Sequence, residues 1–192
     1  MSDESISEIR PYLYLSGYSC LNETILQEMG ITHAVDATNF PECLRISGIE
    51  YFGVEIDDSE IADLKKYFEP AARFIRNARG EGGKILVYCA AGISRSSSIV
   101  IIYLMICEGL TLRQAYCEVS RSRPIIAPNL GFWRQMIEYE KEKFGGSTVT
   151  LLNGMRKPIP NVYINKTKPV DEVKWRMFCE KYPDAEDQFF LS

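Results

Sequence analysis

The chain has 192 residues, of which 46% are hydrophobic and 25% are charged, and its formal net charge at pH 7 is −4. This composition is typical of a globular protein that buries enough apolar surface to fold without disulfides or metal ions. The negative net charge disfavours nucleic acid as a general partner, because phosphate backbones are bound by clustered lysines and arginines.

Histidine and cysteine usage narrows the possible chemistry further. The single histidine, His33, lies in an apolar, strand-like run. Hydrolases with a Ser-His-Asp triad, phosphatases that use a phosphohistidine, and metal sites with several histidines are therefore disfavoured. The six cysteines include no pair with C-x-x-C spacing. We therefore expect free thiols in a reducing compartment, with no metal site and no cofactor.

The N-terminal residues are acidic and polar, unlike a secretory or mitochondrial targeting segment. The longest purely apolar run, 99–107, is too short to cross a bilayer, and no myristoyl or prenyl signal is present. These features predict a cytoplasmic protein without a membrane anchor, with the nucleus as a second compartment.

Strand-like and helix-like runs alternate in the first half of the chain. Apolar residues at helical spacing predict one helix over 21–29 with Asn22 as its N-cap. A second helix is predicted from Glu69 to Gly80, with Glu69 as its cap. Runs rich in β-branched and aromatic residues predict four strands, over 12–15, 31–37, 51–56 and 84–88.

Three helices are predicted in succession after the last strand. The first is the strongly apolar run 95–108. Thr111 and Gln114 form a capping box for the second, and Asn129 caps the third. Strands that alternate with helices, followed by consecutive helices, predict an α/β fold with a central, mainly parallel, twisted sheet flanked by helices.

The clearest functional pattern is the loop between the strand 84–88 and the helix that begins at Arg95. The free N–H groups and partial positive charge at a helix N-terminus suit an anion, and Gly92 permits a turn whose amides point inward. Arg95 offers a planar fork for two phosphate oxygens, and the same positive surroundings favour the thiolate of Cys89. A lone cysteine before a glycine usually fills the core, but this context predicts a phosphoryl-transfer site. The predicted phosphate-binding residues are Ala90, Ala91, Gly92, Ile93, Ser94 and Arg95.

From Cys89 to Ser96 the sequence resembles the signature loop of the cysteine-based protein tyrosine phosphatases, and specifically the atypical dual-specificity branch. The resemblance covers about residues 8–165 and includes the segments 103–105, 123–126 and 128–135. It implies a catalytic domain over 1–165 and a C-terminal tail over 166–192.

The resemblance also implies roles for individual residues. Cys89 would be the nucleophile that forms a phosphocysteine, Arg95 would bind the phosphoryl group, and Ser96 would hydrogen-bond the thiolate and help it leave. A general acid is implied as well, a contribution of about 10²–10⁴ in rate, in the acidic turn after the strand 51–56. Asp57 and Asp58 are both candidates, and an apolar pair followed by Asp and a small polar residue favours Asp58. A solvated turn is the other interpretation of this Asp-Asp-Ser sequence.

Two positions depart from the family pattern. Tyr88 stands where the family has a histidine that helps to orient the loop and favour the thiolate, and tyrosine carries no positive charge at neutral pH. Weaker activity, or activity shifted to higher pH, is expected. Ala127 stands where close relatives often carry arginine, so the positive rim around the pocket should be thinner.

The loop contains no lysine, which disfavours inositol lipids and leaves phosphoproteins as the expected substrates. The resemblance implies hydrolysis of phosphotyrosine and of phosphoserine or phosphothreonine, with mitogen-activated protein kinases as one candidate partner. The main alternative is a weakly active or inactive pseudophosphatase that binds phosphoproteins, which Tyr88 suggests. A sulfurtransferase also uses a cysteine in an anion-binding loop, but the long apolar helix after Arg95 disfavours it.

Overall fold

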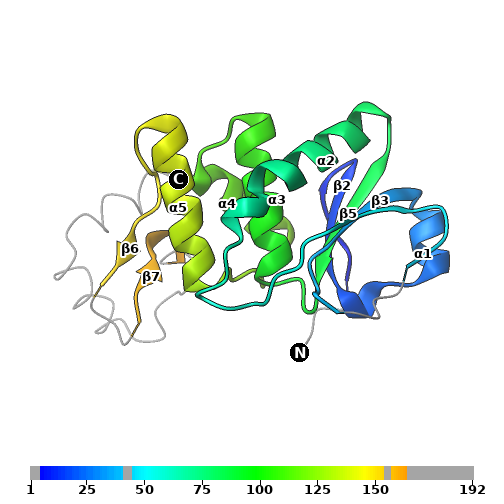
Figure 1. Cartoon of the computed structure of the whole chain (residues 1–192), viewed down its shortest axis with the longest axis horizontal. Helices are drawn as coiled ribbons and strands as arrows, with labels where there is room; N and C mark the ends of the chain where they lie inside the picture. The colour runs from blue at the N-terminus through cyan, green and yellow to red at the C-terminus, as the bar shows by residue number, and fades with distance from the viewer. Residues whose placement is uncertain (1–4, 41–44, 154–156, 164–192) are drawn as a thin grey trace. The chain divides into compact units, whose positions relative to one another are not determined.

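A five-stranded sheet in the order β1-β2-β5-β3-β4 organises the computed structural model, which describes residues 5–40, 45–153 and 157–163 (Figure 1). Strands β2 to β5 run parallel to their neighbours, and β1 pairs antiparallel with β2. The predicted α/β fold with a mainly parallel sheet is confirmed. The strands are β1 (Ser7–Arg10), β2 (Leu13–Gly17), β3 (Ile31–Asp36), β4 (Glu50–Gly53) and β5 (Lys84–Cys89).

Two strands differ from the sequence-based expectation. β1 was not predicted, because its four residues include only one apolar side chain, Ile9, and an edge strand has little periodicity to reveal it. The predicted strand 51–56 pairs only as far as Gly53. Beyond it Val54 N–H donates to Asp36 O (2.8 Å), and the chain then leaves the sheet toward Asp58.

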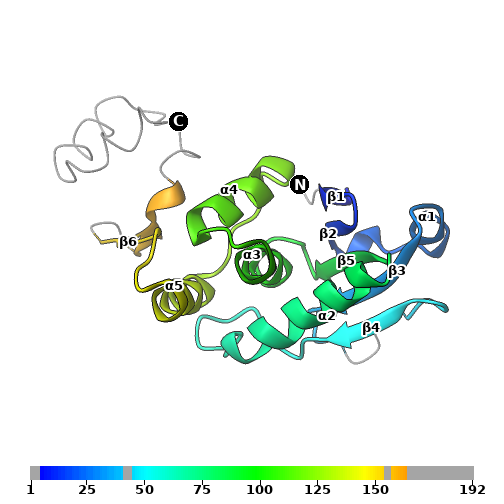
Figure 2. The same cartoon turned by 90° about the horizontal axis from the view of Figure 1, so that it is seen from above.

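Helices cover both faces of the sheet, with α2 and α3 on one face and α1 on the other (Figure 2). The side chains of Asn22 and Asn129 accept hydrogen bonds at the starts of α1 and α5, and Thr111 with Gln114 forms the predicted capping box of α4. The predicted cap at Glu69 is wrong, because a 3₁₀ turn leads directly into α2 and the backbone is already helical at Tyr67. The helices are α1 (Glu23–Glu28), α2 (Phe68–Gly80), α3 (Arg95–Glu108), α4 (Leu112–Ser122) and α5 (Leu130–Phe144).

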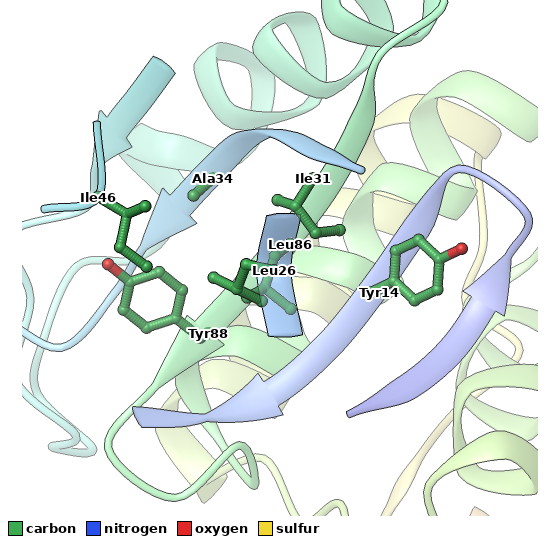
Figure 3. Packing of buried hydrophobic residues seen from close by; sticks show 7 residues of the cluster. All are labelled: Tyr14, Leu26, Ile31, Ala34, Ile46, Leu86 and Tyr88. Carbon is green, nitrogen blue, oxygen red and sulfur yellow. The ribbon is translucent and has the colours of Figure 1, made fainter. Parts of the chain in front are cut away.

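The central strand β5 is buried on both faces, and its side chains alternate between them. Leu86 and Tyr88 pack with Leu26 of α1 in an apolar cluster on one face (Figure 3). Ile85 and Val87 point to the opposite face, toward α2 and α3. By the same alternation Cys89 follows Val87, so the strand delivers this cysteine to the side where α3 begins.

The chain divides into two compact units, residues 1–148 and 149–192. In the described part of the second unit, β6 (Leu151–Leu152) pairs antiparallel with β7 (Ile159–Pro160), and a 3₁₀ turn (Asn161–Tyr163) follows. The predicted domain boundary at 165 and the tail over 166–192 lie outside the described residues. Among the residues that are described, no helix is long and apolar enough to cross a membrane.

The capping box of α4 provides a test of how much the Thr111 side chain stabilises the fold. We expect Thr111→Ala to lower the free energy of unfolding by about 1 kcal/mol, because the side-chain acceptor of the Gln114 N–H is lost. Urea denaturation measures this change. Thr111→Ser keeps the acceptor and should unfold near the wild-type midpoint; equal losses in both variants would contradict a capping role.

Candidate active site

The loop between β5 and α3 is pressed against the end of β2. Gly92 has φ +69°, and a Cβ atom there would lie 2.5 Å from the backbone carbon of Ser16. Tyr18 N–H also donates to Ala90 O (3.1 Å). Glycine is therefore required at position 92 both by its backbone conformation and by the close approach of β2.

The Cys89 thiol lies at the floor of this loop and is only 2% exposed. Its Sγ accepts hydrogen bonds from Gly92 N–H (3.3 Å) and from Ser96 Oγ (3.1 Å). Two donors and the N-terminus of α3 stabilise negative charge on the sulfur. The structure thus brings Cys89 and Ser96, both selected from the sequence, into contact.

Arg95 opens α3 and is 8% exposed. Its Nη1 donates to Thr38 O (2.7 Å) and Ile56 O (3.4 Å), which fixes the guanidinium beside the loop. Its buried Nε–H has no hydrogen-bond partner within the part of the chain that the structure describes. Because an unpaired buried donor is costly, this group is suited to an anion in the loop, such as a phosphate oxygen.

Asp58 lies against the loop as well. Its Oδ1 accepts hydrogen bonds from Ser94 Oγ (2.7 Å) and from Asn129 Nδ2 (2.7 Å), and its Oδ2 lies 4.0 Å from Arg95 Nε. Asp57 instead accepts a hydrogen bond from Asn39 Nδ2 (2.9 Å). Of the two candidate acids, Asp58 is therefore the one in contact with the residues of the phosphate-binding loop.

Residues 57–60, which we call the acid turn, are joined to α5 by Asn129. The sequence predicted Asn129 only as a helix cap. Its Oδ1 accepts from Phe132 N–H (3.0 Å) while its Nδ2 donates to Asp58, so one amide performs both tasks. Its own N–H donates to Ser94 Oγ (3.0 Å). Two residues further on, a Cβ atom at Gly131 would overlap the carbonyl oxygen of Glu60, so α5 packs directly on the acid turn.

A buried guanidinium supports the loop from behind, and sequence analysis did not assign it this role. Arg123 is fully buried, and its Nε donates to Gly92 O (2.8 Å) and its Nη2 to Ala91 O (3.4 Å). Its Nη1 donates to Ser5 O (3.0 Å). In a trans peptide the N–H points opposite to the C=O, so holding these carbonyls from behind directs the following amides toward the pocket. The Gly92 N–H, which points at Cys89 Sγ, is one of them.

The two positions that depart from the family pattern have different surroundings. The ring of Tyr88 is fully buried in the α1-side cluster, with Leu26, Ala34 and Leu86, on the face of β5 opposite to Cys89 (Figure 3). Ala127 is exposed at the surface, and its N–H donates to Ile93 O of the loop (3.0 Å). An arginine at position 127 would therefore stand beside the loop, as expected from the sequence.

Comparisons with known proteins agree with this geometry. The family model described as dual specificity phosphatase, catalytic domain, matches residues 13–142. Dual specificity protein phosphatase 14 from Homo sapiens is 38% identical over 170 residues, which cover 85% of this chain and 83% of the relative. The crystal structure of human DUSP28 has a TM-score of 0.68 at 31% identity and covers 71% of this chain and 93% of its own. Human tyrosine phosphatase-like serine/threonine/tyrosine-interacting protein has a TM-score of 0.66 at 34% identity, covering 71% and 96%.

The hydrogen bond from Ser96 to Cys89 gives a test of the site that does not depend on any substrate. We expect Ser96→Ala to slow alkylation of Cys89 by iodoacetamide at neutral pH several-fold, because one donor to the thiolate is lost. Peptide mass spectrometry follows the reaction at each cysteine. Burial raises the pKa of the Cys107 thiol, so this cysteine should react slowly throughout.

Ser98→Ala is the matched control, because the Ser98 hydroxyl lies on the same helix but donates to Ser94 O. An equal slowing in both serine variants would indicate a general disturbance of α3 and would contradict a specific role of Ser96.

Proposed function

The chain belongs to the dual specificity phosphatases of the cysteine-based protein tyrosine phosphatase superfamily, and on this basis we propose that it hydrolyses phosphoproteins through a phosphocysteine on Cys89. The substrates are phosphotyrosine and phosphoserine or phosphothreonine side chains. The observation that carries this proposal is the buried Arg95 Nε–H, which has no hydrogen-bond partner in the described structure. Arg95 begins α3 directly after the loop that holds the Cys89 thiol.

In the first step the Cys89 thiolate attacks phosphorus, and the bond from phosphorus to the side-chain oxygen of the substrate breaks. The leaving oxygen takes its proton from the Asp58 carboxylic acid. Hydrogen bonds from Ser94 and Asn129 hold this side chain beside the loop. Arg95 and the loop amides bind the phosphoryl oxygens before and during the transfer.

In the second step water attacks the phosphocysteine, and Asp58, now a carboxylate, takes the proton of the water. The bond from sulfur to phosphorus breaks, and Ser96 Oγ hydrogen-bonds the departing thiolate. Phosphate and the starting form of the enzyme result.

Phosphorylated proteins are the class of partner that family membership implies. Within that class we propose mitogen-activated protein kinases as one candidate, on the basis of the resemblance to dual-specificity phosphatases. Turnover of a phosphorylated kinase by the wild type, compared with a set of unrelated phosphoproteins, tests this choice.

Cys89→Ser tests the nucleophile. We expect loss of turnover of a small aryl phosphate by more than a thousandfold, because a serine hydroxyl is a far weaker nucleophile in this environment. Binding of a phosphopeptide should persist, since the loop amides and Arg95 are unchanged. Steady-state kinetics and fluorescence polarisation measure the two properties. Turnover close to that of the wild type would refute the cysteine mechanism.

The role of Asp58 is tested by the leaving group. We expect Asp58→Asn to slow hydrolysis of an alkyl or phenyl phosphate by about 10²–10⁴, and hydrolysis of an activated aryl phosphate much less, because a good leaving group needs no proton. Rates measured over a series of leaving groups separate these cases. A uniform loss across the series would contradict general-acid catalysis by Asp58.

Asn129→Asp is a companion variant for the same series. It retains a side-chain acceptor for the Phe132 N–H but replaces the amide that donates to Asp58 with a like charge. If Asn129 positions the acid, this variant should show the same dependence on the leaving group as Asp58→Asn, to a smaller extent.

A second candidate function is binding of phosphoproteins with little or no turnover. Tyr88 favours it, as does the similarity to the human protein described as tyrosine phosphatase-like. We expect Tyr88→His to raise turnover of an aryl phosphate, but by less than about tenfold, because a histidine buried in an apolar cluster stays largely neutral. A wild type without measurable turnover that binds phosphopeptides tightly would favour the binding function.

A further inference from the structure

Several segments lie in or next to the loop between β5 and α3, and we call them the rim: Tyr18, 39–40, 57–61, 90–93 and 127. Most of these residues are exposed, whereas Gly92 is buried. One half of the rim can be followed through direct contacts. Tyr18 N–H donates to Ala90 O (3.1 Å), and the Tyr18 ring meets the Phe40 ring edge to face, with centroids 5.7 Å apart. Asn39 next to it donates through Nδ2 to Asp57 Oδ1 (2.9 Å).

The other half returns to the same loop. Asp58, which follows Asp57, accepts from Asn129 Nδ2 (2.7 Å), and Ala127 lies two residues before that asparagine. Ala127 N–H donates to Ile93 O (3.0 Å), and Ile93 belongs to the same loop as Ala90. These contacts link Phe40, Asp57, Asp58 and Ala127 to the loop that holds Cys89.

The charge of the rim is unusual for a site that receives a dianion. Its residues include no lysine or arginine, whereas Asp57 and Asp58 bring carboxylates to one side, and Glu60 beside them is paired with Arg134. The guanidinium of Arg95 lies at the floor, below the rim. Two cations close to these loops are already in ion pairs, Arg134 with Glu60 (3.8 Å) and Arg45 with Asp36 (3.1 Å).

The apolar character of the rim is equally clear. Four large apolar side chains are exposed among the described residues, and two of them, Phe40 and Ile61, belong to the rim. Ile61 is 94% exposed and lies three residues after Asp58. A single exposed apolar residue is ordinary, but these two stand on two different segments of the rim, which also contains the small exposed side chains of Ala90 and Ala127.

We infer that the rim selects segments with a single phosphorylated residue and an apolar side chain next to it. An apolar neighbour gains contact with Ile61 or Phe40, which otherwise face water. A second phosphate or an acidic neighbour is repelled by the rim carboxylates, and the rim has no lysine or arginine to compensate. Such a segment should therefore bind with lower affinity. This inference rests on the proposed function of the same site and defines its substrate class more narrowly: a kinase substrate would be preferred in its singly phosphorylated form.

Three synthetic phosphotyrosine peptides of equal length test the inference. They carry leucine beside the phosphotyrosine, glutamate at the same position, or a phosphothreonine two residues away. We expect the leucine peptide to bind Cys89→Ser, and to be hydrolysed by the wild type, at least about fivefold better than the other two, measured as Kd and as kcat/KM. Equal values within about twofold, or a preference for the doubly phosphorylated peptide, would overturn the inference.

Substitutions on the rim assign the selectivity to its residues. Ala127→Arg adds a cation beside Ile93 and should remove the preference against the second phosphate. Ile61→Ser should reduce the ratio of kcat/KM between the leucine and glutamate peptides. Ile25→Ser changes an exposed apolar side chain on α1, outside the rim, and should leave both ratios as in the wild type. If Ile25→Ser lowers the ratio of kcat/KM between the leucine and glutamate peptides as much as Ile61→Ser does, the inference is also overturned.

The outcomes separate the two proposals. Selective binding by Cys89→Ser together with a wild type that hydrolyses none of the peptides would refute the proposed catalysis and retain the rim selectivity. Hydrolysis of all three peptides at equal kcat/KM would refute the rim selectivity alone.

Discussion

The buried guanidinium of Arg123 fixes the loop on which every other part of the site depends. It holds the carbonyls of Ala91 and Gly92 from behind and also reaches Ser5, ahead of the first strand. With the carbonyls held, the Gly92 N–H points at the thiol of Cys89. The conformation of the loop is thus supported by contacts of Arg123 with the rest of the fold.

The acid turn depends on the same loop through Ser94. Its hydroxyl donates to Asp58 and accepts from the backbone of Asn129, and Asn129 in turn donates to Asp58. These three residues form a small closed network between the loop, the acid turn and the start of α5. Asp58 is therefore held by hydrogen bonds to the same loop that contains Cys89.

The parts of the site that sequence analysis predicted are those whose geometry is local. Cys89, Arg95 and Ser96 lie within eight consecutive residues, and a strand followed by a helix determines their arrangement. The contacts that were missed span long separations: Asn129 reaches Asp58 over 71 positions, and Arg95, itself predicted, reaches Thr38 over 57. Arg123 was not predicted to support the loop, because its complete burial cannot be recognised from the sequence. The sequence predicted β5 as a strand, but the cluster around Tyr88 depends on the position of α1 and was not predicted.

The tight packing of Gly131 on Glu60 has a consequence for motion. Because α5 lies in direct contact with the acid turn, and Asn129 holds Asp58 from the same helix, the turn has little freedom to swing away from the pocket. In enzymes whose acid is carried by a mobile lid, closure of the lid often limits the rate. If Asp58 is the acid, as proposed, it needs no closing lid, so turnover should be limited by chemistry or by release of phosphate, and solvent viscosity should have little influence on the step that delivers the proton.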